Sequence, residues 1–175
     1  MQHAEDNELS QNGMMNDGVI ATKLGLQGIP EVAEKIIIER DLSLLEDFNC
    51  RYHISQISSS KSLEVIEKKK DQVDFTTGVS INNLSLNEND IGDFRTFLKL
   101  SPPLRTEEDR QSLIRGINKD LREVLVSDHK PEDEESKRLT FSQAATGASG
   151  IETLLPLSLE LFHNNSIKLP KIIKL

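Results

Sequence analysis

The stretch RYHISQISSSKSLEVIEKKK, residues 51–70, decides the fold class of this chain. Its first part, residues 52–57, is predicted to be a strand, and Ser60 can cap a helix over residues 61–70. The apolar residues of that helix that would pack on a sheet are Leu63, Val65 and Ile66. A short strand followed at once by an amphipathic helix is the repeating unit of a parallel α/β fold, and neither a helix bundle nor a β-sandwich is built from it.

The segment before this stretch is predicted to be another helix, over residues 29–48. Pro30 suits the first turn of a helix, and Glu31 and Glu34 favour its positive end. The expected apolar stripe of this helix consists of Val32, Ile36, Ile37, Leu44 and Leu45. The chain therefore presents one helix, then a strand, then a second helix within its first 70 residues.

The segments after this stretch continue the alternation. Further strands are predicted over residues 73–81, 97–100 and 123–126. Thr106, followed by three acidic residues, can cap a helix that runs to about residue 118. Residues 132–137 are predicted to be a solvated acidic loop, and a closing helix is predicted over residues 152–163.

Composition limits the classes of function. The 175 residues, 36% of them hydrophobic, can bury one domain-sized core. The net charge of -8 argues against a nucleic-acid partner or an anionic membrane, because both need clustered Lys and Arg. No stretch approaches the roughly 20 apolar residues of a membrane span, and residues 2–12 lack the order of a signal peptide. The single cysteine, Cys50, fits a reducing compartment. We therefore expect a cytoplasmic protein.

Several short motifs occur in a fixed order along the chain. They are RYHISQISSS, NENDIG at residues 87–92, LSPPLRTEEDR at residues 100–110, SDHKP at residues 127–131, KRL at residues 137–139 and GIETLLPL at residues 150–157. Together they make the chain resemble the dihydroorotases of the amidohydrolase superfamily, in particular those of alphaproteobacterial type. The resemblance covers essentially the whole chain. It implies an α/β fold that is a partial (β/α)8 TIM barrel of the metal-dependent amidohydrolase type.

A complete barrel of this kind takes about 250 residues and eight βα units, whereas four strands with their helices are predicted here. Compared with dihydroorotases, the chain begins at the exit of the fifth barrel strand and stops before the final helices. We therefore interpret residues 1–175 as the carboxyl-terminal half of the barrel. The other half would hold the family's His-x-His pair and the bridging metal ligand. A homo-oligomer is expected when the barrel is complete, whereas the half alone should be poorly stable or self-associate through its uncovered interior and sheet edges.

The resemblance also assigns candidate site residues. Opening or closing a cyclic amide near neutral pH needs a polarised carbonyl, a hydroxide-like nucleophile and a proton carrier, and zinc with a carboxylate supplies all three. His3 in QHAED matches the family's strand-end metal histidine. Asp128 in SDHKP matches the final-strand aspartate, which in the family binds metal and shuttles the proton, so Asp128 is the implied catalytic residue. Taken alone, His3 also fits a surface residue, and Asp128 fits a turn or N-cap residue.

Other positions depart from the family pattern. Gln56 stands where His-x-x-His-x-Ser has its second histidine, and an amide oxygen is a poorer zinc ligand than imidazole. His53 is expected not to replace it, because residues three apart on a strand point to opposite faces. Ser101 stands at a substrate-binding asparagine, and Glu132 stands where a histidine holds the substrate carboxylate. Zinc is the cofactor that the family implies, but we expect this chain alone not to bind it tightly.

Three functional hypotheses follow from the resemblance. The first is that the chain is part of a dihydroorotase, an enzyme that reversibly cyclises N-carbamoyl-L-aspartate to dihydroorotate in pyrimidine biosynthesis. The second is a catalytically silent dihydroorotase-like subunit that supports aspartate transcarbamoylase. The third is another cyclic-amide hydrolase, a hydantoinase or an allantoinase, in which the Ser-Pro-Pro-Leu-Arg motif also occurs. Residues 87–92 and the spacing from SDHKP to KRL favour the first hypothesis over the third.

Overall fold

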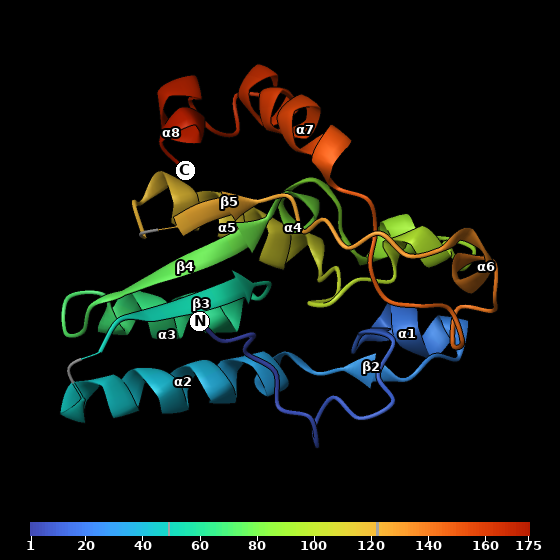
Figure 1. Cartoon of the computed structure of the whole chain (residues 1–175), viewed down its shortest axis with the longest axis horizontal. Coiled ribbons are helices and arrows are strands. Elements are labelled where there is room, and N and C mark those ends of the chain that lie inside the picture. Colours follow the sequence, from blue (N-terminus) through green and yellow to red (C-terminus); the bar gives the residue numbers. More distant parts are fainter. Residues whose placement is uncertain (49, 122) are drawn as a thin grey trace.

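The centre of the molecule is a three-stranded parallel sheet, seen in a computed structural model that describes residues 1–48, 50–121 and 123–175 (Figure 1). Its strands are β3 (Tyr52–Ile57), β4 (Phe75–Ser80) and β5 (Glu123–Val126), in the order β3-β4-β5. Gln2 adds a single parallel bridge to Ile54 on the free edge of β3. The first residues of the chain therefore lie beside β3, in the place that a fourth parallel strand of the sheet would occupy.

Three helices pack along the sheet, one before β3 and one in each connection between its strands (Figure 1). They are α2 (Glu31–Asp47), α3 (Ser60–Lys69) and α5 (Glu107–Asn118). The other helices are α4 (Ile81–Ser85), directly after β4, α7 (Ile151–His163) and α8 (Leu169–Lys174). Smaller elements form a second lobe at the carboxyl ends of the strands: β1 (Met15–Asn16), α1 (Val19–Leu24), β2 (Gly28–Ile29), the 3₁₀ helices Glu88–Ile91 and Thr96–Leu98, and α6 (Glu134–Lys137). No helix within the described residues is long and apolar enough to cross a membrane.

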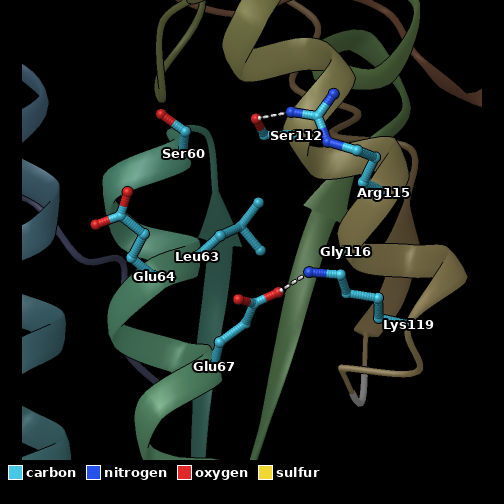
Figure 2. A pocket seen from close by; sticks show the side chains of 8 residues that line it. All are labelled: Ser60, Leu63, Glu64, Glu67, Ser112, Arg115, Gly116 and Lys119. Carbon is cyan, nitrogen blue, oxygen red and sulfur yellow. Dashed lines mark hydrogen bonds and ion pairs between the residues drawn. The ribbon is translucent and has the colours of Figure 1, made fainter.

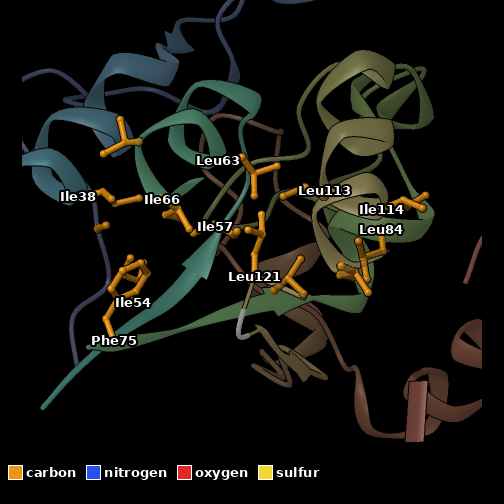
Figure 3. Close-up of a cluster of buried hydrophobic side chains, with 14 of the residues drawn as sticks. Ile38, Ile54, Ile57, Leu63, Ile66, Phe75, Leu84, Leu113, Ile114 and Leu121 are labelled. Carbon is orange, nitrogen blue, oxygen red and sulfur yellow. The ribbon is translucent and has the colours of Figure 1, made fainter. Parts of the chain in front are cut away.

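The main core lies between the sheet and the three connecting helices (Figure 3). Ile54 and Ile57 of β3 are almost fully buried there. The helices contribute Ile37, Ile38 and Leu42 from α2, Leu63 and Ile66 from α3, and Leu113, Ile114 and Ile117 from α5. Burial of such side chains stabilises the fold by about 1.5–3 kcal/mol each. The predicted alternation of strands and helices is confirmed, because each helix buries its apolar face on the same sheet.

The outer surface between α3 and α5 is a shallow polar groove (Figure 2). Gly116 is buried on α5, where α3 and α5 pack side by side. Lys119 spans the groove by an ion pair of 2.8 Å with Glu67. These groups lie on the helical side of the sheet, away from the strand ends that carry the predicted site.

Several elements differ from the sequence prediction. In α2, Val32, Ile36 and Leu44 are exposed, because the run of three isoleucines offers two overlapping apolar faces and the buried one contains Ile37 and Ile38. Ser59, rather than Ser60, caps α3 and accepts a hydrogen bond from the backbone N–H of residue 62. Residues 97–100 form no strand: the first two end the 3₁₀ helix Thr96–Leu98, and the other two follow it. The predicted acidic loop contains the short helix α6.

The largest difference concerns the direction of His53. The β3–β4 register shifts between Ile54 and Ile57, and this bulge buries both isoleucines on the helical face. His53 therefore lies on the opposite face, where its Nδ1 is 2.7 Å from Thr76 Oγ1. The expectation that His53 and Gln56 point to opposite faces was wrong, because it assumed an unbroken period of two.

Candidate functional site

The candidate site lies at the carboxyl ends of the parallel strands. His3 follows the bridge between Gln2 and β3, Gln56 ends β3, and Asp128 follows β5 by two residues. Parallel strands bring their carboxyl ends to one edge, which is where barrel enzymes carry their catalytic groups. Asp128 adopts a left-handed conformation with φ of 50°, which turns the chain out of the sheet at this point.

Asp128 is held by two side chains from the neighbouring strands. Gln56 Nε2 donates to Asp128 Oδ1 at 2.7 Å, and Ser80 Oγ, at the end of β4, lies 3.5 Å from Oδ2. Burial raises the pKa of Asp128 above its ordinary value, while the hydrogen bond from Gln56 opposes that rise. The carboxyl group is therefore fixed in direction and binds a proton more readily than an exposed aspartate.

His3 belongs to a second small cluster at the same edge. Its Nε2 lies 3.1 Å from Ser101 Oγ and 3.4 Å from Glu5 Oε2, and Ser101 Oγ donates to Glu5 at 3.3 Å. Hydrogen bonding to Glu5 raises the pKa of His3, although partial burial opposes it. Asp128 also raises the pKa of His3 through its charge. The two clusters therefore interact electrostatically.

The structure thus brings together four of the five candidate residues in two pairs, Gln56 with Asp128 and His3 with Ser101. Glu132 lies apart from these pairs, and its Oε1 is 3.9 Å from Lys130 Nζ. His129, next to Asp128, points away from the site, because its Nδ1 accepts the backbone N–H groups of Gly150 (3.1 Å) and Ile151 (3.4 Å). His129 therefore caps the first turn of α7, which has no side-chain cap at residue 150.

A buried polar network supports the end of β3 beneath the site. The Glu34 carboxylate accepts hydrogen bonds from the backbone and the hydroxyl groups of both Ser58 and Ser59. Arg105 Nε donates to Ser58 Oγ at 3.1 Å, and Arg105 Nη1 donates to Asn16 Oδ1 at 2.9 Å. All these side chains are nearly fully buried. The network fixes the turn that follows Gln56.

Two contributors to the site were not predicted from the sequence. Glu5 contacts both His3 and Ser101, and its place two residues after His3 was the signal that could have found it. Asn82, in α4, lies close enough to Asp128 to lower the pKa of that carboxyl. Its buried Nδ2 has no hydrogen-bond partner among the described residues. The site therefore holds a buried amide donor that stabilises the charged form of Asp128 without a full hydrogen bond to it.

The donor set does not fit a catalytic zinc ion. Such an ion normally takes three protein ligands, and the described residues contain no group of three His, Cys, Asp or Glu side chains placed to hold a metal. The Gln56 amide donates to Oδ1 of Asp128, one of the two oxygen atoms that this carboxylate could offer to a cation. Gln56 and Asp128, which occupy positions that the family resemblance assigns to metal ligands, are thus joined to each other by a hydrogen bond.

Comparison with known proteins identifies the relationship. A family model described as dihydro-orotase-like matches residues 1–62. A dihydroorotase from Ehrlichia canis (strain Jake) is 43% identical over 170 residues, which are 96% of this chain and 38% of the relative. The chain is similar to dihydroorotases over nearly its whole length. It spans about two fifths of the length of such relatives, which include dihydroorotases from other alphaproteobacteria.

Solved structures of hydantoinases and of a dihydroorotase share the fold of this chain. An L-hydantoinase from Arthrobacter aurescens superimposes with a TM-score of 0.81 and 24% identity, over 98% of this chain and 40% of the hydantoinase. A dihydroorotase from Saccharomyces cerevisiae, in complex with 5-fluoroorotic acid, superimposes with a TM-score of 0.71 and 16% identity, over 91% of this chain and 44% of the yeast chain. The fold is part of a TIM barrel, as the sequence predicted.

Proposed function

We propose that residues 1–175 are the carboxyl-terminal portion of a dihydroorotase-type barrel, which in complete form interconverts N-carbamoyl-L-aspartate and dihydroorotate in pyrimidine biosynthesis. The observation that carries this proposal is the placement of Asp128, which is partly buried, has a raised pKa and is held by Gln56 and Ser80 at the strand ends. The sequence relationship to dihydroorotases supports it. The cytoplasm is the proposed compartment.

The chemistry assigned to Asp128 is proton transfer. In ring opening, water adds to the ring carbonyl carbon, the bond from that carbon to nitrogen breaks, and the nitrogen leaves with a proton. A carboxyl group with a raised pKa can take a proton from the water and give it to the nitrogen. The reverse sequence closes the ring and releases water. We assign no step to zinc, because the described donors do not fit that ion.

The second candidate is a catalytically silent dihydroorotase-like subunit, with aspartate transcarbamoylase as the partner that the resemblance implies. The hydrogen bond between Gln56 and Asp128 favours this candidate. An amide in this place keeps the two side chains together without a cation, so the strand ends stay ordered while the metal-dependent activity is lost. A homo-oligomer of the complete barrel is compatible with both candidates.

Reconstitution of the barrel distinguishes the two candidates. The chain would be assembled with the amino-terminal portion of the Ehrlichia canis dihydroorotase, and assembly would be verified by sedimentation before any assay. The carboxyl-terminal portion of the same relative serves as the matched positive control. Dihydroorotate formation by the assembled complex, abolished by Asp128→Asn, is the result expected for an enzyme. An assembled complex without turnover, beside an active control, would reject that activity and support the silent subunit.

A further inference from the structure

Two lysines near the candidate site are buried, which is uncommon for this residue type. Lys99 is 9% exposed and lies two residues before Ser101. Lys137 is 3% exposed and ends α6. Within the described part of the chain, no carboxylate lies within ion-pairing distance of either ammonium group. Burial lowers the pKa of both lysines. The charge of Glu132 opposes this effect at Lys137, and the positive charge of Lys99 adds to it.

Backbone carbonyl groups of one short segment surround both ammonium groups. Lys99 Nζ donates to the carbonyl oxygens of Ser142 (3.0 Å) and Ala144 (2.9 Å). Lys137 Nζ donates to those of Ala145 (2.8 Å) and Gly147 (2.7 Å). The charges also lie over aromatic rings, Lys99 at 5.9 Å from the Phe141 centroid and Lys137 at 5.8 Å from that of Phe97. Four carbonyls of residues 142–147 thus converge on two cations.

Burial of the two ammonium groups costs free energy, and their hydrogen bonds to backbone carbonyls offset that cost. Desolvating an ammonium group is unfavourable unless hydrogen bonds replace the lost water. Buried carbonyls outside helices and sheets also need donors, and residues 142–147 belong to neither. Each lysine therefore donates to two carbonyls that accept no other hydrogen bond among the described residues. Hydrogen bonds from the ammonium groups therefore order residues 142–147, as backbone hydrogen bonds would do in a strand or a helix.

The same segment lies along the edge of the candidate site. The backbone N–H of Gly147 donates to the carbonyl oxygen of Lys99 at 2.9 Å, close to Ser101. The backbone N–H of Lys130 donates to the carbonyl oxygen of Ala148 at 2.9 Å, close to Asp128. A Cβ atom added to Gly150 would lie 2.1 Å from the carbonyl oxygen of Ser127, so the two backbones touch at the end of β5. Residues 142–150 therefore connect the Ser101 side of the site with the Asp128 side.

We propose that Lys99 and Lys137 are positioning residues, whose ammonium groups hold residues 142–150 as the rim of the site between Ser101 and Asp128. The ordering of the rim follows from contacts within this chain. Its consequence for dihydroorotate rests on the proposed function. Neither lysine is assigned contact with the reacting atoms.

Hydrogen exchange measured by mass spectrometry tests the ordering directly. Lys137→Met keeps the apolar stem but removes the charge and both donors. Loss of two hydrogen bonds to a charged group is expected to reduce the protection of residues 142–150 about tenfold or more, with β4 and α5 unchanged. Lys130→Met is the matched control, because the side chain of Lys130 is 63% exposed and makes no contact of this kind. Protection of the rim in Lys137→Met equal to that in Lys130→Met would overturn the proposal.

Chemical rescue separates a role for the cation from a role in packing. Lys137→Ala leaves a space that propylammonium fills with a charge and donors, whereas propan-1-ol has a similar shape without the charge. Recovery of rim protection with propylammonium, and not with propan-1-ol, is the expected result. Equal recovery with both compounds, or equal loss of protection in β4 and α5, would show that Lys137 acts only as packing volume and would reject the proposal.

A kinetic measurement on the reconstituted barrel extends the test to the site. Lys137→Met is expected to raise KM for dihydroorotate severalfold and to change kcat less, because a disordered rim weakens binding more than proton transfer. An unchanged KM would contradict the assignment of residues 142–150 to the rim of the site. If the unmodified complex has no activity, the proposed function fails, and hydrogen exchange alone decides the role of the lysines.

Discussion

Replacing Ser58 by alanine tests whether the buried network fixes the end of β3. Ser58 is fully buried, and its hydroxyl donates to the Glu34 carboxylate while accepting from Arg105 Nε at 3.1 Å. A hydrogen bond to a charged group contributes about 1.5–3 kcal/mol, so two of them set an upper range of about 3–6 kcal/mol. Ser59 Oγ, 3.3 Å from Glu34 Oε1, can compensate for part of the loss. We expect the free energy of unfolding to fall by about 3 kcal/mol.

The assay is equilibrium urea unfolding followed by circular dichroism, at one fixed protein concentration. Ser43→Ala is the matched control, because Ser43 is exposed on α2, and its free energy of unfolding should change by less than about 0.5 kcal/mol. A loss below about 1 kcal/mol for Ser58→Ala, with an unchanged dependence on urea, would refute the role given to the network. That outcome would mean that Glu34 and Arg105 find other partners at little cost.

Three further predictions concern the bulge, the His3 cluster and the open sheet. Gly78→Ala should destabilise the fold by several kcal/mol in the same urea assay, because the added Cβ would lie 2.0 Å from the carbonyl oxygen of Ser55; a loss under about 1 kcal/mol would contradict the bulge geometry. The raised pKa of His3 and the lowered pKa of Glu5 predict that this pair stabilises the fold most between about pH 4.5 and 6.5. The stabilisation should be lost as pH rises through the raised pKa of His3, and also as pH falls through the lowered pKa of Glu5. An NMR titration should show the pKa of His3 fall in Glu5→Gln, and an unchanged value would count against the pair. Sedimentation at several concentrations should show self-association, because β3 and β5 leave sheet edges uncovered, and a monomer at every concentration would argue against it.

Local sequence signals predicted most of the fold. Strands β3, β4 and β5 and helices α2, α3, α5 and α7 lie within one or two residues of their predicted bounds. The Thr106 cap was also correct, and Asp109 completes a capping box there. Such features depend on residues near one another in sequence, so composition and spacing reveal them. The candidate pairs at the strand ends depended instead on the family resemblance.

The features that escaped prediction depend on distant contacts. The bulge in β3 requires Gly78 of β4 to accommodate the carbonyl oxygen of Ser55, and a single strand read alone gives no sign of it. Residues 97–100, apolar except for Lys99, suggested a strand, but the backbone and side chain of Lys99 bond to residues 142–147. Lys137 ends an acidic stretch that predicts a solvated loop, and only the fold supplies the carbonyls that accept from its ammonium group.

The central claim is that Gln56 and Asp128 form one site of dihydroorotase type, in which an amide has taken a metal-ligand position. It is tested most directly by the zinc content of the reconstituted barrel, measured for the unmodified chain, for Gln56→His and for Gln56→His combined with Asp128→Ala. We predict little zinc with the unmodified chain, a clear gain of zinc with Gln56→His, and loss of that gain with the double variant. Tight zinc binding by the unmodified chain, lost with Asp128→Ala alone, would contradict the account and show that Gln56 is compatible with a metal-ligand position.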